Sequence, residues 1–245
     1  MKALILAAGL GTRLMPLTAD TPKTLVTVNG VTLLEIAIRK LAEAGFNEII
    51  VNVHHHAAKV KDFIRDHTFP GAAIAISDES GLLLDTGGAI LNARPFLDGN
   101  EPFLVHNVDV ISNIDLHLLK ESHDIKNSLA TLSVIDRKTR RYFLFDDELR
   151  LAGWTDTSTG EKKWVGNPLK EARQLAFSGI HIIEPDIFDL FEEKGRFSII
   201  DAYLSLAKKR PIFGYIQDDA VWFDVGKPDQ IATVTDFTRK HPEFI

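Results

Sequence analysis

Residues 6–25 of this chain read LAAGLGTRLMPLTADTPKTL and combine flexible backbone with fixed positive charge. Gly9 and Gly11 are separated by one residue, Arg13 follows shortly after, and Lys23 lies ten residues beyond Arg13. Glycines let backbone N–H groups approach an anion closely, and a guanidinium together with an ammonium can neutralise a chain of phosphates. The segment therefore suggests a phosphate site that could also stabilise a departing pyrophosphate.

Two well-known phosphate-binding patterns do not fit this segment. A P-loop has lysine directly after its last glycine, whereas Thr12 follows Gly11 here. A dinucleotide-binding fingerprint needs a third glycine, where this chain has Leu14, and an acidic residue after the second strand, where it has His54. The glycines alone could be a tight turn beside two solvated cations. The length of the whole pattern favours a functional role.

Two aspartates lie at positions that could serve a hard metal ion. Asp109 ends the apolar run FLVHNVD, at the edge where a doubly wound sheet presents its active site. Asp224 lies in WFDVGKPDQI, just before a closing helical pattern. Magnesium-assisted phosphoryl chemistry needs such oxygen ligands near the phosphates. A single aspartate at a strand end is, however, more often a turn or cap residue.

Two glycine segments each allow a binding interpretation and a structural one. Gly87 and Gly88, in LDTGGAI, could let a flat base approach the backbone, or could open a helix that Asp85 or Thr86 caps. Gly179, in FSGIHII, could admit sugar hydroxyls or could form a bulge. Both interpretations can hold at residues 87 and 88, and at residue 179 they are evenly balanced.

The run of histidines at residues 54–56 does not indicate a zinc site. Successive side chains of an extended chain point to alternating faces, so the three rings do not converge on one ion. We expect His54, at the end of a strand, to face the substrate on its sugar side.

The composition restricts the classes of partner and compartment. With 245 residues and 45% hydrophobic residues, the chain can bury a full core. A net charge of −6 argues against nucleic acid as a partner, and no apolar run approaches the roughly 20 residues of a membrane helix. The absence of cysteine excludes disulfides and thiolate chemistry. These features suit a cytoplasmic protein.

The candidate residues must be positioned by strands and helices, and the hydrophobic pattern of the chain indicates an α/β fold. Over residues 1–112, strand-like runs such as KALILA and EIIVNV alternate with helical stripes, of which residues 33–44 are the clearest, ending at Gly45. This alternation predicts a doubly wound, mostly parallel, Rossmann-like sheet. Beyond residue 113 the runs are mainly strand-like, with helical patterns at about 186–193, 199–209 and 228–239. The polar stretch 156–174 is expected to form a long, mobile hairpin or loop.

The opening segment resembles the signature of the sugar-phosphate nucleotidyltransferases, G-x-G-T-R-hydrophobic-x-P-L-T followed by P-K. The resemblance extends to about residue 235 and implies one domain of the GT-A-like nucleotidyltransferase type. Its expected parts are a nucleotide-binding half (1–112), a sugar-binding half (113–225) and a closing helix (226–245). The resemblance also implies that a loop wraps the nucleotide triphosphate through Ala7, Ala8, Gly9, Gly11 and Thr12.

The same resemblance implies roles for the charged residues. Arg13 would contact the leaving pyrophosphate and Lys23 the reacting phosphates. Asp109 and Asp224, in segments that resemble the N-G-D and W-x-D-V-G motifs of the family, would together hold one Mg²⁺. The segment of Gly87 and Gly88 would contact the base, and the segment of Gly179 the sugar.

The chain departs from the family pattern at two places, one beside the expected metal ligand Asp109 and one in the expected binding site of the sugar phosphate. Val108 replaces the usual glycine before Asp109, where a β-branched residue stiffens the turn. The Glu-Lys-Pro motif, whose lysine would grip the sugar phosphate, is absent. Lys162, Lys163 and Lys170 lie in that region but outside any such motif.

The resemblance implies transfer of a nucleotidyl group from an NTP to a sugar 1-phosphate, with release of pyrophosphate. Within the family the chain looks most like the N-acetylmuramate 1-phosphate uridylyltransferases of cell-wall recycling. Mannose-1-phosphate guanylyltransferases and choline-phosphate cytidylyltransferases are alternatives. A catalytically silent sugar-nucleotide-binding protein is an alternative of another class. The protein would act as a monomer or homodimer.

Overall fold

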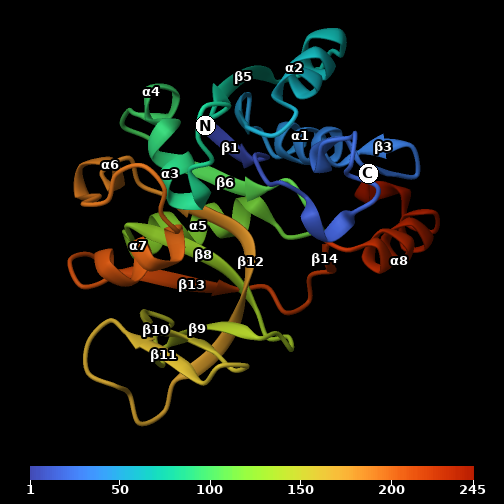
Figure 1. Ribbon diagram of the computed structural model, residues 1–245. Helices are drawn as coiled ribbons and strands as arrows, with labels where there is room; N and C mark the ends of the chain where they lie inside the picture. Colours follow the sequence, from blue (N-terminus) through green and yellow to red (C-terminus); the bar gives the residue numbers. More distant parts are fainter.

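The computed structural model describes all residues, 1–245, and the first half of the chain alternates strands with helices (Figure 1). Two short 3-10 helices, η1 (Thr12–Leu14) and η2 (Lys23–Leu25), lie within the glycine-rich segment. The remaining elements of this half are β1 (Lys2–Leu6), β2 (Thr27–Val28), β3 (Val31–Thr32), α1 (Leu33–Glu43), β4 (Glu48–Val53), α2 (Ala57–Asp66), β5 (Ala73–Asp78), α3 (Asp85–Asn92), α4 (Arg94–Leu97), β6 (Phe103–Asn107) and β7 (Val110–Ser112).

The second half adds strands of a mixed sheet and the closing helix. Its elements are α5 (Leu116–Lys126), β8 (Ala130–Ile135), β9 (Arg141–Phe145), β10 (Leu151–Asp156), β11 (Glu161–Trp164), β12 (Arg173–Ile183), α6 (Ile187–Leu190), α7 (Ile199–Leu206), β13 (Ile212–Ile216), β14 (Trp222–Asp224), α8 (Pro228–Thr238) and the 3-10 helix η3 (Pro242–Phe244). None of the helices is both long and apolar enough to cross a membrane.

The central sheet has the order β11-β10-β9-β12-β6-β1-β4-β5, and β8 and β13 branch from it at β12. Strands β5, β4, β1 and β6 are parallel to one another, and β13 is parallel to β8. The long strand β12 runs antiparallel to β6, β8 and β9. Figure 1 shows β5 at one end of the sheet and β9–β11 at the other. The predicted α/β class with a mostly parallel sheet is confirmed, and the antiparallel pairings of β12 make the sheet mixed, which was not predicted.

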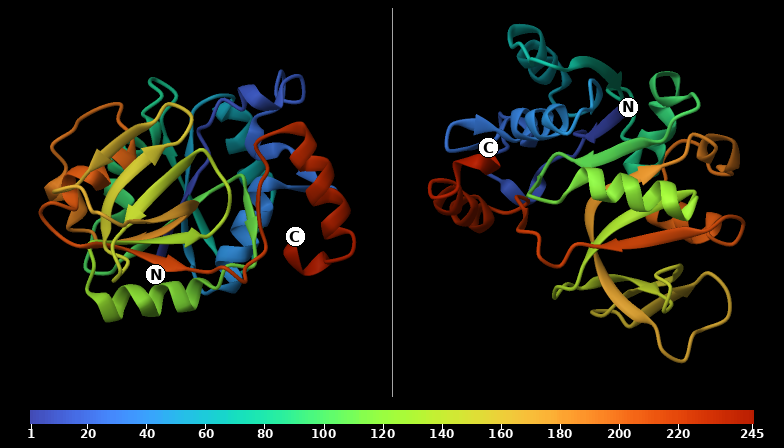
Figure 2. Two further views of the ribbon diagram at one scale, coloured as in Figure 1. Left: turned by 90° about the horizontal axis from the view of Figure 1, so that it is seen from below. Right: turned by 180° about the vertical axis from the view of Figure 1, so that it is seen from behind.

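Two apolar cores lie on opposite faces of this sheet because side chains alternate along each strand. In β1, Ala3 and Ile5 belong to one core and Leu4 to the other, and all three are fully buried. Residues of α1, α2 and α8 pack in the first core, and residues of α3, α4 and α7 in the second. Helix α5 lies against the first face at β8, β12 and β13 (Figure 2). This covering of both faces is the doubly wound arrangement.

The helix of residues 33–44 forms as its pattern indicates. The Thr32 hydroxyl accepts a hydrogen bond from the Glu35 backbone N–H at 3.1 Å and caps the first turn of α1. After the helix, Gly45 takes a φ of +83°, which ends the helical path.

Several expected boundaries in the second half are wrong. Helix α5 occupies 116–126, where no helix was expected, because its buried side includes the polar His123 and the apolar stripe is therefore interrupted. The helical pattern at 186–193 yields only the short α6. The hairpin or loop expected at 156–174 is present, since β11 pairs there with β10 and residues 165–172 form a loop before β12.

The last strand brings the end of the chain to the end of β6. Strand β14 pairs antiparallel with β7, which follows β6, and Asp224 lies opposite Val110. The backbone N–H of Val225 donates to the Asp109 carbonyl at 2.8 Å. This pairing carries residues more than a hundred positions apart to the same edge of the sheet.

Candidate functional site

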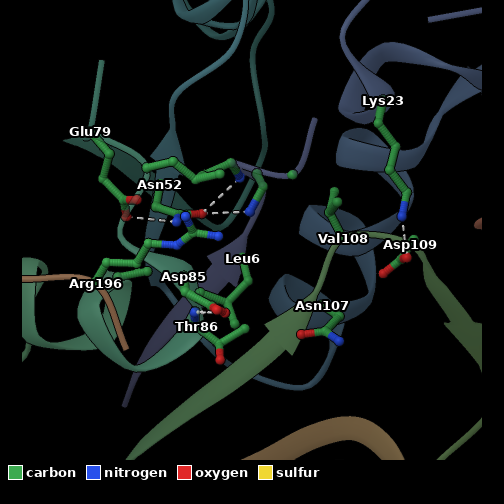
Figure 3. Close-up of a pocket in the computed structure, with 15 residues that line it drawn as sticks. Leu6, Lys23, Asn52, Glu79, Asp85, Thr86, Asn107, Val108, Asp109 and Arg196 are labelled. Atoms are coloured by element: carbon green, nitrogen blue, oxygen red, sulfur yellow. Dashed lines mark hydrogen bonds and ion pairs between the residues drawn. The ribbon is translucent and has the colours of Figure 1, made fainter. Parts of the chain in front are cut away.

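The carboxyl ends of the parallel strands β1, β4, β5 and β6 form the wall of a cavity of about 350 Å³. This is the edge at which open α/β sheets bind ligands. Of the residues singled out from the sequence, Ala7, Ala8, Gly9, Lys23 and Asp109 line it. We call it the larger cavity (Figure 3).

A second cavity of about 200 Å³ adjoins the first, and we call it the smaller cavity. Asn107 and Asp109 line both, so the end of β6 forms the boundary between them. Arg13, Gly179 and Asp224, all singled out from the sequence, also line the smaller cavity. Two ligands, one in each cavity, would therefore meet at Asp109.

Lys23 and Asp109 form an ion pair at this boundary (Figure 3). Both side chains are largely buried, with 13% and 16% of their surfaces exposed. Burial alone would raise the pKa of Asp109, but the charge and hydrogen bond of Lys23 hold it below its ordinary value. Asp109 is thus an ionised carboxylate within reach of both cavities.

Asp224 has the opposite electrostatic character. Burial, and then the neighbouring negative charge of Asp109, raise the pKa of Asp224 above its ordinary value. Its Oδ1 atom is buried and has no hydrogen-bond partner. A buried carboxylate oxygen without a partner, beside a second carboxylate, suits a divalent cation, and Mg²⁺ is usually held by one or two carboxylates plus phosphate oxygens. The residues present therefore fit Mg²⁺.

Gly9 and Gly11 are glycines for different reasons: the fold needs a glycine at 11, whereas at 9 the missing side chain leaves space in the cavity. Gly11 has a φ of +65°, and a Cβ there would lie 3.0 Å from Thr18 Cγ2 and 3.1 Å from Lys23 Cβ, so the fold itself needs glycine. Gly9 has an ordinary φ, and a Cβ would meet nothing within 4 Å. Because Gly9 lines the larger cavity, the space that it leaves open is space for a ligand.

Arg13 reaches the smaller cavity beside Asp224, and Gly226 makes the approach possible. A Cβ on Gly226 would lie 2.6 Å from Arg13 Nη2 and 2.7 Å from Asp224 Oδ1. Arg13 belongs to η1, whereas Lys23 lies at the start of η2. The two cations therefore reach the boundary between the cavities from different sides, Arg13 in the smaller cavity and Lys23 in the larger.

Three functional candidates in the larger cavity are absent from the sequence-based set: Asn52, Glu79 and Arg196. The Asn52 Oδ1 atom accepts from the backbone N–H groups of Ala7 and Ala8, and its Nδ2 donates to Glu79 Oε1 at 2.8 Å. Glu79 is 3% exposed, and its Oε2 atom has no partner. Burial raises the pKa of Glu79, although the hydrogen bond from Asn52 opposes this. Figure 3 shows this group at the opposite end of the cavity from Lys23.

One signal in the sequence could have identified part of this group. Asn52 interrupts the apolar strand EIIVNV at a position that proves to be buried, and a buried amide needs hydrogen-bond partners. Glu79 follows the end of β5, and such strand-end polar residues gather at the ligand edge of a parallel sheet.

Other residues chosen from the sequence lie outside both cavities. Gly87 and Gly88 belong to α3, and a Cβ at either would collide with the Phe197 ring or the Gly195 carbonyl. Close packing of α3 on the segment before α7 therefore requires these glycines, while Thr86, their neighbour, lines the larger cavity.

Thr12 and His54 also line neither cavity. Thr12 begins η1, next to the Arg13 that does reach the smaller cavity. The His54 Nδ1 atom lies 2.7 Å from the Glu79 carbonyl oxygen, so His54 braces the chain that carries Glu79.

Val108 and Gly179 shape the end of β6. Val108 is 4% exposed, has no positive φ, and its N–H donates to the Leu6 carbonyl at 3.2 Å, so a valine is accommodated before Asp109 without backbone strain. Gly179 has a φ of +80°, and a Cβ would lie 2.7 Å from Asn107 Nδ2. The bulge in β12 between Phe177 and His181 thus allows close approach to the strand end.

Comparisons with known proteins show what the chain is similar to. A family model described as nucleotidyl transferase matches residues 2–241. An N-acetylmuramate alpha-1-phosphate uridylyltransferase from Neisseria meningitidis serogroup B is 32% identical over 92% of this chain and 93% of its own length. A mannose-1-phosphate guanyltransferase 2 from Candida glabrata is 28% identical over 99% of this chain and 67% of its own length. Among solved structures, a UDP-glucose pyrophosphorylase from Acinetobacter baumanii superposes with a TM-score of 0.81 at 19% identity, over 99% of this chain and 95% of that one.

Proposed function

Because the chain belongs to the nucleotidyl transferase family, we propose that it transfers a uridylyl group from UTP to N-acetylmuramic acid 1-phosphate. The products would be pyrophosphate and a UDP-sugar. The coarser activity, sugar-1-phosphate nucleotidyl transfer, follows from the family match and the relatives. The choice of UTP and of the N-acetylmuramic acid ester follows the relative that is 32% identical over nearly its full length.

The observation that carries the proposal is the meeting of two cavities at Asp109, with Lys23 on one side and Asp224 and Arg13 on the other. One cavity would take the triphosphate and the other the sugar phosphate. A phosphate oxygen is already ionised at neutral pH, so the reaction needs alignment for in-line attack on the α-phosphorus and no general base. The main obstacle is repulsion between two anions, which Lys23 and Arg13 would reduce.

We assign the metal-binding role to Asp109 and Asp224. The unpartnered Oδ1 of Asp224 and the ionised Asp109 supply the hard oxygen ligands that Mg²⁺ requires. When bound, Mg²⁺ would neutralise phosphate charge at the boundary between the cavities. Lys23, paired with Asp109 here, would then be available to contact phosphate oxygens.

The group at the far end of the larger cavity supports UTP over CTP. When Glu79 is ionised, which its burial opposes and the hydrogen bond from Asn52 favours, its unpartnered Oε2 could accept a hydrogen bond from one ring N–H of a base. Uracil and guanine carry such a ring N–H, whereas cytosine has a lone pair at the corresponding nitrogen. With cytosine bound, the buried Glu79 oxygen would have no donor, and a buried acceptor left unpaired strongly disfavours that ligand. Guanine remains compatible with this group, and the relative with guanyltransferase in its name makes GTP with mannose 1-phosphate the second candidate.

The smaller cavity does not favour a choline phosphate as acceptor. A quaternary ammonium would need an open aromatic face and acidic neighbours. Trp222 and Phe177 do line the cavity, but the Arg137 guanidinium already lies 4.0 Å from the centre of the Trp222 ring. A second cation would have to displace it.

The test is pyrophosphate release in a matrix of UTP, GTP, CTP, ATP and dTTP against the 1-phosphates of N-acetylmuramic acid, N-acetylglucosamine, glucose and mannose. We expect the highest kcat/KM for UTP with N-acetylmuramic acid 1-phosphate. Reactions without sugar phosphate control for hydrolysis. A clear preference for GTP with mannose 1-phosphate would replace the proposed substrates by the second candidate, and no release with any pair would refute the enzymatic proposal.

A further inference from the structure

The smaller cavity gathers three buried polar atoms that have no hydrogen-bond partner: Arg137 Nε, Ser178 Oγ and Asp224 Oδ1. Buried polar atoms in folded proteins are normally paired, and each exception asks for an explanation. Asp224 is accounted for above as a metal ligand. Arg137 and Ser178 each have an unpaired donor at the smaller cavity, and neither has a role in the proposed reaction.

The Arg137 side chain is held in place on several sides. Its Nη2 donates to the Phe177 carbonyl at 3.2 Å, and its guanidinium stacks on the Trp222 ring. Trp222 is itself fixed, because its Nε1–H donates to the Ser178 carbonyl at 2.8 Å. A guanidinium that is already oriented loses little side-chain freedom when a ligand binds.

Arg137 also lacks a carboxylate partner. It forms no ion pair, whereas Arg140 and Arg141, its neighbours in the sequence, both pair with Asp156. Burial lowers the pKa of Arg137, and the negative charge of Asp224 opposes this. A half-buried cation without a partner, opening into a cavity, indicates an anionic ligand.

We propose that Arg137 and Ser178 bind the phosphate of the acceptor sugar 1-phosphate. This inference rests on the proposed function and supplies the residue that the missing Glu-Lys-Pro motif leaves unassigned. Phosphate is the group that must lie at the boundary of the two cavities, because its oxygen forms the new bond to the α-phosphorus as the bond to pyrophosphate breaks. No proton moves in that step. Arg137 fixes the phosphate on the acceptor side, opposite Lys23.

Lys162, Lys163 and Lys170, which lie in the region of the missing motif, do not compete for this role. Lys163 is ion-paired with Asp201 and lies over the Trp154 ring on the β10–β11 hairpin. Lys162 and Lys170 line neither cavity. Arg137 is therefore the one cation of the second half that lines the smaller cavity.

The first test compares Arg137→Gln and Arg137→Lys with the matched control Arg140→Gln. Arg140 lies three residues away, is 71% exposed and lines neither cavity, so its replacement makes the same charge change outside the site. For Arg137→Gln we expect KM for the sugar 1-phosphate to rise roughly ten- to a hundredfold, with KM for the NTP within about twofold of wild type. Arg137→Lys should recover part of the loss, and Arg140→Gln should match wild type. Unchanged KM for the acceptor in Arg137→Gln would overturn the proposal.

The second test measures binding directly by calorimetry, so it does not depend on turnover. The probes are inorganic phosphate, glucose 1-phosphate and N-acetylmuramic acid 1-phosphate, of which only the last carries a carboxylate. Weaker binding of all three to Arg137→Gln supports the phosphate assignment. A loss confined to N-acetylmuramic acid 1-phosphate would instead assign Arg137 to the carboxylate and refute our assignment.

The two proposals can fail separately. If the wild-type protein turns over no substrate pair but binds inorganic phosphate through Arg137, the proposed function fails while the phosphate site stands. If the wild-type protein turns over a pair and Arg137→Gln binds all three probes normally, the phosphate site fails. Should Arg137→Gln not fold, Arg137→Lys carries both tests, since it keeps the charge and loses the planar, fixed donors.

Discussion

Replacing Gly226 by alanine should lower activity without lowering stability. Gly226 has no positive φ, so alanine is compatible with its backbone. The new Cβ would lie 2.6 Å from Arg13 Nη2 and 2.7 Å from Asp224 Oδ1, where ordinary contacts begin at 3.4 Å. The shortfalls, 3.4 − 2.6 and 3.4 − 2.7, are about 0.8 Å and 0.7 Å. Arg13 is exposed and can swing away, and the Asp224 carboxylate must rotate away from the new methyl group.

These displacements set the expected magnitude. A misplacement of about 1 Å in a reacting assembly can cost roughly a hundredfold in rate. We therefore expect kcat/KM of Gly226→Ala to fall by about two orders of magnitude, which corresponds to roughly 2.7 kcal/mol in the activation free energy. A glycine-to-alanine change also restricts the unfolded chain and stabilises by roughly 0.4–1 kcal/mol where the backbone permits it. The free energy of unfolding should stay within about 1 kcal/mol of wild type.

The assay measures initial rates of pyrophosphate release over a range of Mg²⁺ concentrations, together with thermal unfolding. The matched control is Gly166→Ala, since a Cβ at Gly166 meets nothing within 4 Å and its φ is also ordinary. We expect the Mg²⁺ concentration for half-maximal rate to rise only in Gly226→Ala, because the new methyl group covers the unpartnered oxygen of Asp224. If Gly226→Ala kept wild-type kcat/KM and Mg²⁺ dependence, Arg13 and Asp224 would not share the reaction site, and the reasoning would be refuted.

Three other predictions concern single residues. Lys23→Ala should reduce kcat roughly 10²- to 10³-fold with an unchanged circular dichroism spectrum, and near-normal turnover would contradict its role. Gly9→Ala should raise KM for the NTP and leave Tm unchanged, because its Cβ would meet no protein atom. Gly88→Ala should lower Tm, because its Cβ would collide with the Gly195 carbonyl. The reverse pattern would contradict the ligand role of Gly9 and the packing role of Gly88. Burial lowers the pKa of Lys40 from 10.5 to about 8, so the unfolded chain binds more protons between these pH values and stability rises with pH across them. The free energy of unfolding, measured with denaturant at pH values near 8 and 10.5, should therefore rise by roughly 3 kcal/mol less in Lys40→Met than in wild type. An equal rise in the two proteins would argue against a lowered pKa of Lys40.

Several candidate residues that the structure places at a cavity could be chosen from short segments of sequence. Lys23 belongs to a local pattern of glycines, prolines and cations, and the apolar run before Asp109 identifies a strand end. The alternation of runs over residues 1–112 was sufficient to predict the parallel strands and their common ligand edge. Each of these signals is contained within a few tens of residues.

The residues that were missed depend on contacts between distant segments. The proposed role of Glu79 depends on Asn52, on the neighbouring strand, which donates to it across the sheet edge. The proposed role of Arg137 depends on the Phe177 carbonyl of β12 and on the ring of Trp222, contributed by β14, which hold it at the smaller cavity. Conversely, Gly87 and Gly88 looked like ligand glycines, although packing against the segment before α7 explains them. These contacts join residues that are far apart in the sequence, so the spacing of residue types along the chain does not predict them.

The most direct test of the central claim is the Mg²⁺ dependence of pyrophosphate release from UTP and N-acetylmuramic acid 1-phosphate. We predict one pyrophosphate per UDP-sugar formed in the wild-type protein, and no Mg²⁺-dependent rate in the Asp109→Asn, Asp224→Asn double variant. Mg²⁺-driven turnover that persisted in that variant, or pyrophosphate formed without any sugar phosphate, would contradict the account of two substrates meeting at these carboxylates.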